Sequence, residues 1–220
     1  MSELDSIIIE TQENPDAAVI WLHGLGADGN DFVPVIDQLQ LPSHLAIRFV
    51  FPHAPVRPIT INQGYQMPGW YDISSLSIVD NEDEDGIKES SAILQQLCEE
   101  QEAAGIDADR IVVAGFSQGG AVAIHCGVRY PKQLAGIMAL STYLPLPDSL
   151  QKEMSDYAVD TPVFMAHGRQ DDVVAYEHGK KSQTLLEQAG MAVDWHEYDM
   201  AHAVCGEEIS HIRQWLTDLL

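Results

Sequence analysis

Short apolar runs alternate with longer segments that are apolar on one side only along most of the 220-residue chain. The short runs predict β-strands, and several are almost continuously apolar, as expected of strands that helices cover on both faces. The runs lie at residues 17–22, 46–51, 110–114, 136–140, 162–166 and 193–198, and a further run at 6–10 could add an antiparallel edge strand.

The longer segments predict helices between these strands. In the segment at 86–104, for example, Ile87, Leu94, Leu97 and Cys98 recur at helical spacing and form one apolar stripe. The other predicted helices lie at residues 29–39, 119–129, 176–189 and 206–220. Strands that alternate with helices are typical of an α/β fold, a parallel sheet with helices on both faces.

Residues 52–85 break this alternation within the predicted single domain of residues 1–220. Four prolines and two glycines punctuate the segment, and it shows no long helical period. It also carries large side chains that are costly to leave in water, Tyr65, Met67, Trp70 and Tyr71. Because long loops in compact domains are usually functional, we expect this segment to be a loop on the substrate side of the molecule.

Charge, apolar run length and cysteine content limit the expected partners and compartment of the protein. Eleven basic and 34 acidic residues give a formal net charge of −23, which repels phosphate and anionic lipid and argues against a nucleic-acid partner. No apolar run approaches the roughly 18 residues of a membrane helix, so membrane insertion is not expected. The cysteines, Cys98, Cys126 and Cys205, are odd in number and far apart, which favours a reduced, cytoplasmic protein.

The strongest chemical signal is the motif Gly115-Phe116-Ser117-Gln118-Gly119. It follows the predicted strand at 110–114 and opens the predicted helix at 119–129. This is the setting of a nucleophile elbow, which presents the Ser117 hydroxyl at the carboxyl end of the strand. A Cβ at either glycine would clash where strand and helix approach closely. The helix dipole stabilises negative charge that develops beside Ser117.

A serine becomes nucleophilic when a positioned base takes its proton. In this fold the acid and then the histidine follow the serine along the chain. His202 lies in the predicted loop after the last strand, whereas the other later histidines fall within predicted helices or strands or at a strand end. Asp171 and Asp172 both follow the preceding strand, and either could orient the imidazole while the other caps a helix.

The oxyanion of the intermediate needs two backbone N–H donors, one from Gln118 and one from a loop after an early strand. The glycine-rich segment 23–29 fits that second loop. It also matches Gly-x-Gly-x-x-Gly, a phosphate-binding pattern, but an acidic chain with no other nucleotide signature disfavours a nucleotide cofactor.

Neither a metal nor a cofactor is predicted elsewhere. The acidic segment 81–86 resembles the start of a calcium loop, but Ala92 stands where that loop needs a bidentate Glu. His23, His53 and His167 lack the spacing of zinc ligands. We therefore predict that residues 81–86 are a solvated helix start and that these histidines are structural.

Taken together, these residues resemble the carboxylesterase and acyl-protein thioesterase family of α/β-hydrolases. The resemblance runs nearly end to end, through residues 19–26, 51–55, 67–72, 84–88, 110–121, 140–145, 167–174 and the region around 202. It implies an α/β-hydrolase fold, with a mostly parallel twisted sheet, helices on both faces and no large cap domain.

The resemblance also assigns roles to single residues. It implies that Ser117 is the nucleophile and His202 the base. It selects Asp171 over Asp172 as the acid, three residues beyond a His-Gly pair. The implied oxyanion donors are Leu25 and Gln118, and the long loop borders the acyl pocket, with Met67 and Trp70 as its expected substrate contacts. Ala201 departs from the family pattern, in which glycine often precedes the histidine.

We therefore expect a serine hydrolase without a cofactor that cleaves short- to medium-chain carboxylic esters, and by extension acyl thioesters, through an acyl-serine. The expected partner is a small-molecule ester or an acylated protein, and the resemblance implies a homodimer. Two alternatives are a small serine peptidase and a ligand-binding protein with vestigial chemistry. No clamp for peptide ends is recognisable, and the intact set Ser117, Asp171 and His202 argues against the second.

Overall fold

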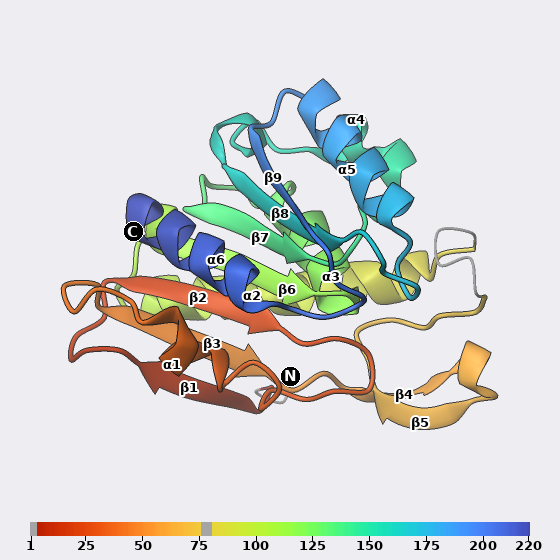
Figure 1. Ribbon diagram of the computed structural model, residues 1–220, viewed down its shortest axis with the longest axis horizontal. Coiled ribbons are helices and arrows are strands. Elements are labelled where there is room, and N and C mark those ends of the chain that lie inside the picture. Colours follow the sequence, from red (N-terminus) through yellow and green to blue (C-terminus); the bar gives the residue numbers. More distant parts are fainter. Residues whose placement is uncertain (1–3, 76–80) are drawn as a thin grey trace.

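The computed structural model describes residues 4–75 and 81–220, and a seven-stranded sheet runs through its middle (Figure 1). The strand order is β1-β3-β2-β6-β7-β8-β9. The strands are β1 (Ser6–Glu10), β2 (Ala17–Leu22), β3 (Ile47–Pro52), β6 (Ile111–Phe116), β7 (Gly136–Leu140), β8 (Val163–Gly168) and β9 (Val193–Tyr198). Only the pairing of β1 with β3 is antiparallel within this sheet, so the predicted antiparallel edge strand is confirmed.

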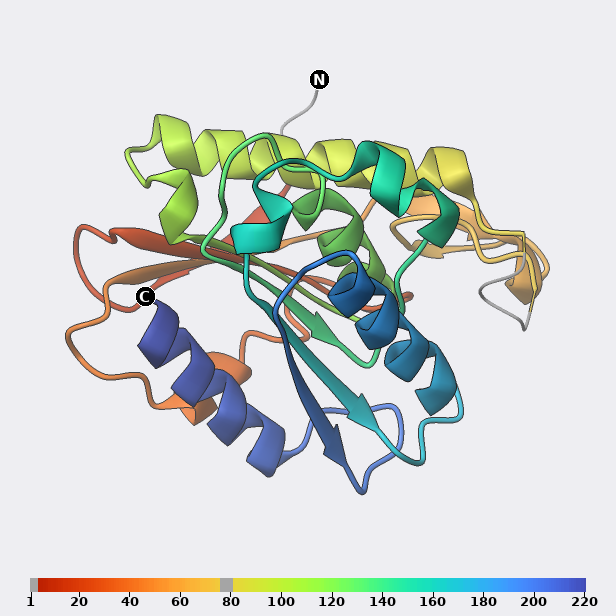
Figure 2. The same ribbon diagram turned by 90° about the horizontal axis from the view of Figure 1, so that it is seen from above.

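Helices cover both faces of the sheet (Figure 2). One face packs against α2 (Glu84–Ala103), α3 (Gln118–Gly127), α4 (Leu150–Glu153) and α5 (Tyr176–Gln188), and the other against α1 (Val35–Leu39) and α6 (Gly206–Leu219). Short 3-10 helices lie at Thr60–Asn62, Ala108–Arg110, Pro147–Ser149 and Ala158–Asp160. This arrangement agrees with the expected α/β-hydrolase fold, and the described residues contain no large cap domain.

The pattern of burial explains why the strand predictions succeed. All six residues of β2 are buried, and alternate side chains enter the two cores, with Ile20 on one face and Val19 and Trp21 on the other. The apolar stripe of α2 packs onto the sheet, and Ile87 and Leu94 are fully buried. No helix among the described residues is long and apolar enough to cross a membrane.

The predicted helix at 29–39 is wrong over its first half, because only Val35–Leu39 is helical. Pro34 precedes the helix, and a proline disfavours helical backbone at the residue before it. Upstream, Asp28 Oδ1 accepts a hydrogen bond from the backbone N–H of Asn30 at 2.7 Å, which competes with helix formation.

The connection at 52–85 contains structure that the sequence did not predict. Strands β4 (Val56–Ile59) and β5 (Tyr65–Pro68) form an antiparallel hairpin beside the main sheet (Figure 1). Prolines at the edges of a two-stranded ribbon are tolerated, yet they hide the strand pattern from sequence analysis. Residues 76–80 of this connection lie outside the described residues, and the chain continues from 81 into α2.

Candidate active site

Ser117 lies at the sharp turn between β6 and α3, with φ 55° and ψ −119°. Residues other than glycine rarely adopt this conformation, and surrounding structure must hold it. The turn also requires glycine on both sides. A Cβ on Gly115 would lie 2.2 Å from the carbonyl carbon of Gly119, and a Cβ on Gly119 would lie 2.5 Å from the carbonyl oxygen of Leu22. The predicted clash between strand and helix is confirmed at Gly115, whereas a Cβ on Gly119 would clash with the end of β2.

Hydrogen bonds to the end of β7 hold this turn in place. The Ser117 N–H donates to the Leu140 carbonyl at 2.8 Å, and Thr142 Oγ1 donates to the Ser117 carbonyl at 2.6 Å. Within residues 4–75 and 81–220, no hydrogen bond joins the Ser117 hydroxyl to His202. The neighbouring Phe116 ring lies against His202 instead, with 4.7 Å between ring centroids. Catalytic hydrogen bonds are often long before substrate binds, so this geometry keeps both residues as candidates.

The loops after β8 and β9 bring Asp171 and His202 together. His202 Nδ1 donates to Asp171 Oδ2 at 2.7 Å. The Asp171 side chain is fully buried, whereas that of His202 keeps 15% of its surface exposed. Because Nδ1 carries the donated proton, Nε2 can accept another. Asp172 is exposed, so the geometry favours Asp171 as the acid.

The carboxylate of Asp171 is further held by its own turn. Oδ1 accepts hydrogen bonds from the backbone N–H groups of Val173 and Val174, both at 2.9 Å. Burial raises the pKa of Asp171, but the hydrogen bond and charge of His202 and the two backbone donors outweigh it and leave this pKa below its ordinary value. The carboxylate therefore stays ionised at neutral pH, as stabilisation of an imidazolium requires.

His167 lies beneath Asp171 and is fully buried. Its Nε2 donates to the Val174 carbonyl at 2.8 Å and lies 3.4 Å from Asp171 Oδ2, so the proton belongs on Nε2. Nδ1 finds no partner among the described residues. Burial lowers the pKa of His167, which keeps the ring neutral. His167 thus ties the turn that carries Asp171 to the end of β8.

The loop after β2 meets the Ser117 turn. A Cβ on Gly24 would lie 3.6 Å from the Cβ of Ser117. The backbone N–H groups of Leu25 and Gln118, the expected oxyanion donors, make no hydrogen bond in the part of the chain that the structure describes. Gly26 has φ +77°, which glycine adopts at little cost, and its N–H donates to the Pro68 carbonyl at 2.9 Å.

His23 fixes the peptide unit that carries the Leu25 N–H. Its Nε2 accepts from the Ala54 N–H at 3.0 Å, so Nδ1 holds the proton and donates to the Gly24 carbonyl at 2.7 Å. The C=O and N–H of a trans peptide point in opposite directions, so this bond directs the Leu25 N–H away from His23. Burial lowers the pKa of His23 and favours the neutral ring that this arrangement needs.

The two expected substrate contacts, Met67 and Trp70, differ in their accessibility. Met67 is partly exposed, and its Sδ would lie 3.6 Å from a Cβ on Gly26, which places it against the loop of residues 23–29, here called the oxyanion loop. Trp70 is 0% exposed, and its Nε1 donates to the His23 carbonyl at 2.9 Å. A side chain without accessible surface cannot contact a substrate, so the predicted role of Trp70 is corrected to one inside the protein.

The histidines considered as metal ligands bind backbone groups. His53 Nδ1 accepts from the Gly29 N–H at 3.1 Å, and His23 and His167 are engaged as described above. Among the described residues, no group of three His, Cys, Asp or Glu side chains could hold a metal ion. In the acidic segment, Asp83 accepts from the Gly86 N–H at 3.0 Å and caps α2.

Sequence reasoning did not assign His23, His167 or Thr142 to the site. Each of them follows or ends a strand at the carboxyl edge of the sheet, where the candidate residues also lie. The available signal was the pairing of histidine with glycine at 23–24 and 167–168, each a few residues before a candidate donor or acid.

Comparison with known proteins identifies the family of the chain. The model of the phospholipase/carboxylesterase family matches residues 4–220. The chain is 40% identical over 207 residues to acyl-protein thioesterase 1 of Yarrowia lipolytica, covering 92% of this chain and 91% of that protein. It is 41% identical over 213 residues to acyl-protein thioesterase 1 of Neurospora crassa, covering 93% and 87%.

A solved structure shows the same fold. The crystal structure of Zea mays acyl-protein thioesterase 2 superposes with a TM-score of 0.86 at 28% identity, covering 98% of this chain and 99% of that chain. The chain is a hydrolase, built on the fold described above. It belongs to the phospholipase/carboxylesterase family of α/β-hydrolases.

Proposed function

We propose that Ser117, Asp171 and His202 form the catalytic triad of this hydrolase. The observation that carries the proposal is the 2.7 Å hydrogen bond between His202 and the buried Asp171, beside the strained turn of Ser117. His202 Nε2 takes the hydroxyl proton as Ser117 attacks the substrate carbonyl. The imidazolium then gives that proton to the departing alcohol or thiol, and an acyl-serine remains.

Water completes the cycle by the same route. His202 deprotonates the water, which attacks the acyl-serine carbonyl, and the carboxylic acid leaves as Ser117 regains its proton. In both steps the carbonyl oxygen becomes an oxyanion. The N–H groups of Leu25 and Gln118, which make no hydrogen bond among the described residues, are the donors proposed to receive it. One such donor contributes on the order of 2.7–4 kcal/mol to transition-state stabilisation.

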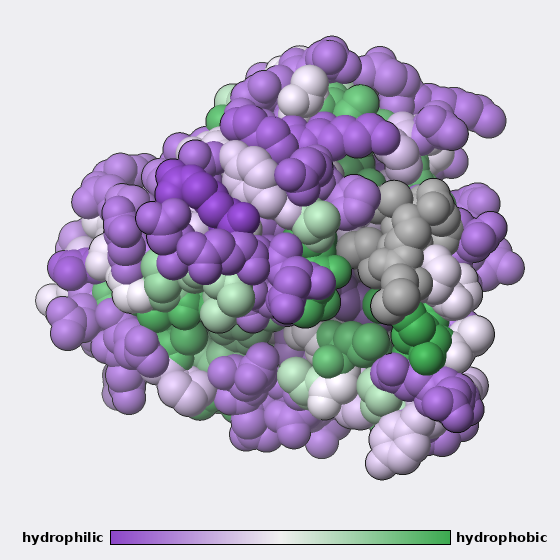
Figure 3. All heavy atoms as spheres, turned by 45° about the vertical axis from the view of Figure 1, so that its right-hand side comes forward, coloured by the Kyte–Doolittle hydropathy of each residue, from purple (hydrophilic) through white to green (hydrophobic). Residues whose placement is uncertain are grey.

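The proposed substrate is an acyl ester or an acyl thioester of a protein. Hydrophobic side chains form a band across an otherwise mostly hydrophilic face of the molecule (Figure 3). Met67 lies against the oxyanion loop, next to an open hollow lined by residues 61–65. An acyl chain suits this apolar band, and an open rim tolerates varied leaving groups.

Hydrolysis of p-nitrophenyl esters of increasing acyl length by wild type and Ser117→Ala tests the proposal. Loss of the nucleophile lowers kcat by roughly 10⁴–10⁶-fold. An S-acylated cysteine peptide and its O-acylated serine analogue, assayed in parallel, distinguish thioester from ester preference. Equal rates for wild type and a folded Ser117→Ala variant would contradict the triad.

The finer expectations of compartment and assembly are also part of the proposal. Cys98 and Cys126 are buried free thiols, which suits the reducing cytoplasm. The homodimer rests on the family resemblance. Sedimentation equilibrium at micromolar concentration tests it directly, with a mass of 24.3 kDa expected for a monomer and twice that for the dimer.

A further inference from the structure

Trp70 is bound to the Ser117 turn through its backbone. The Trp70 N–H donates to Gln118 Oε1 at 2.8 Å, and Gln118 Nε2 donates to the Tyr71 carbonyl at 2.7 Å. Gln118 is only 3% exposed, so water does not compete for these bonds. The side chain of the residue that offers one proposed oxyanion N–H is therefore held by backbone groups of two consecutive residues, Trp70 and Tyr71.

The side chain of the same tryptophan reaches the other half of the oxyanion hole. Trp70 Nε1 donates to the His23 carbonyl at 2.9 Å, and the two rings lie 5.3 Å apart. His23 in turn holds the Gly24 carbonyl, on the peptide unit that carries the Leu25 N–H. One buried indole thus contacts the loop that offers the second donor.

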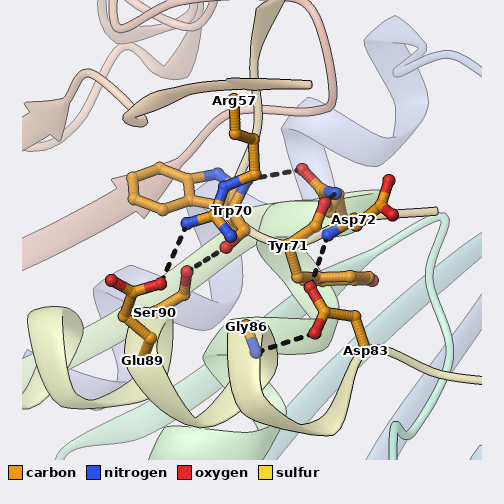
Figure 4. A network of polar contacts seen from close by, with 9 residues as sticks. Arg57, Trp70, Tyr71, Asp72, Asp83, Gly86, Glu89 and Ser90 are labelled. Carbon is orange, nitrogen blue, oxygen red and sulfur yellow. Dashed lines mark hydrogen bonds and ion pairs between the residues drawn. The ribbon is translucent and has the colours of Figure 1, made fainter. Parts of the chain in front are cut away.

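Helix α2 anchors this segment from below (Figure 4). Ser90 Oγ donates to the Trp70 carbonyl, and the Asp72 N–H donates to Asp83 Oδ2 at 2.8 Å. Asp83 also caps the helix through Gly86. The segment 70–72 is therefore fixed to a 20-residue helix, independently of the two loops that it joins.

We propose that Trp70 is a positioning residue that sets the distance and direction between the two oxyanion donors, Leu25 N–H and Gln118 N–H. This inference rests on the proposed function, because it assumes that both groups receive the oxyanion. Donors of this kind act through preorganisation, so an error in their placement costs transition-state stabilisation and leaves substrate binding nearly unchanged. Trp70 therefore affects kcat and has little effect on KM.

The test is Trp70→Phe, which keeps a buried aromatic ring and removes the indole N–H. We expect kcat for p-nitrophenyl esters to fall roughly 10- to 100-fold, less than the 10²–10³-fold of losing a donor outright, with KM changed less than about threefold. An alkyl boronic acid forms a tetrahedral adduct on the serine that places an oxygen in the oxyanion hole. Its inhibition constant should rise by a factor similar to the fall in kcat.

Trp21 offers a matched control within the same chain. It is also a buried tryptophan, 1% exposed, but its Nε1 has no hydrogen-bond partner among the described residues. Trp21→Phe therefore removes an indole N–H that makes no hydrogen bond to the described residues. The kcat of this variant should stay within about threefold of wild type. A similar loss in both variants would mean that tryptophan packing alone matters, and would overturn the proposal.

A second variant tests the proposal in case Trp70→Phe folds poorly. Gln118→Met keeps the backbone N–H and removes both side-chain bonds to segment 70–71, so it should also lower kcat and weaken the boronic acid. Unchanged kcat and boronic acid affinity in folded Trp70→Phe, or a rise in KM without a fall in kcat, would refute the positioning role. Either result leaves the triad standing if Ser117→Ala is inactive, so the two proposals fail separately.

Discussion

The two sides of the site differ in how firmly they are held. On the oxyanion side, Trp70, His23 and Gln118 are almost completely buried, and hydrogen bonds join their side chains to backbone groups. On the base side, His202 is partly exposed, and among the described residues one hydrogen bond to Asp171 and one ring contact with Phe116 hold it.

The difference matches what each side has to do. Oxyanion donors stabilise charge only if they are oriented before the reaction begins, so many fixed contacts serve them. The base must exchange a proton with Ser117, with the leaving group and with water, which requires a ring that can adjust by small movements. We infer that rigidity is concentrated where charge develops and relaxed where protons move.

Replacing the base should have the largest effect. His202→Gln cannot accept the Ser117 proton, so kcat should fall roughly 10⁴–10⁶-fold, far more than for Trp70→Phe on the oxyanion side. Steady-state hydrolysis of a p-nitrophenyl ester measures it, with circular dichroism as the check on folding. A fall of less than tenfold would show that another group acts as the base.

The acid should come next. Asp171→Asn keeps the shape of the site but loses the charge and favours the wrong tautomer of His202, so kcat should fall by about 10⁴-fold. Asp172→Asn is the matched control, because Asp172 is its exposed neighbour, and its kcat should equal that of wild type. A larger fall in kcat for Asp172→Asn than for Asp171→Asn would identify Asp172 as the acid.

A buried carboxyl on the base side makes stability depend on pH. Glu208 follows the His202 loop in α6 and is 0% exposed, and burial raises its pKa from 4.5 to about 8. Between these values the unfolded chain loses this proton while the native protein retains it. The contribution of Glu208 to the free energy of unfolding therefore falls as pH rises from 4.5 to 8.

Glu208→Gln removes this pH dependence. Relative to wild type, the variant should gain on the order of a few kcal/mol at pH 8 over its difference at pH 5, as measured by urea unfolding. Glu207→Gln, at the exposed neighbouring position, should show no such trend. An equal pH trend in wild type and Glu208→Gln would contradict a buried, protonated Glu208.

The smallest effect should come from the anchor of the oxyanion side. Ser90 is fully buried and donates to the Trp70 carbonyl. Ser90→Ala removes one hydrogen bond and should lower the free energy of unfolding by about 1–2 kcal/mol, with a smaller loss of kcat than Trp70→Phe. A larger loss of kcat than in Trp70→Phe would show that Ser90 on α2, more than the Trp70 indole, positions the oxyanion donors.

Most of the fold could be predicted because strands and helices that are buried against the sheet show as apolar runs and stripes in the sequence. The apolar run of β2, the stripe of α2 and the edge strand β1 all appear where the pattern placed them. The hairpin β4–β5 was missed because Pro58 lies within β4 and Pro68 ends β5, and proline is not typical of strands. The start of the helix at 29–39 was wrong because local hydrogen bonds and Pro34 compete with helical backbone.

The candidate site also has a part that the sequence reveals and a part that it does not. The turn that carries Ser117 could be predicted because a strand, a tight turn and a helix each restrict the residues around it. The role of Trp70 could not, because composition indicates that a tryptophan prefers burial but not which carbonyl its N–H will meet. His23 and His167 bind backbone groups, and such bonds impose no spacing between side chains that a sequence could reveal.

Covalent trapping tests the central claim most directly. A fluorophosphonate probe reacts with an activated serine, and peptide mapping by mass spectrometry locates the adduct. We predict one adduct per chain, on Ser117, that is absent in Ser117→Ala and forms far more slowly in His202→Gln. An adduct on another residue, or no adduct on folded wild-type protein, would contradict the account.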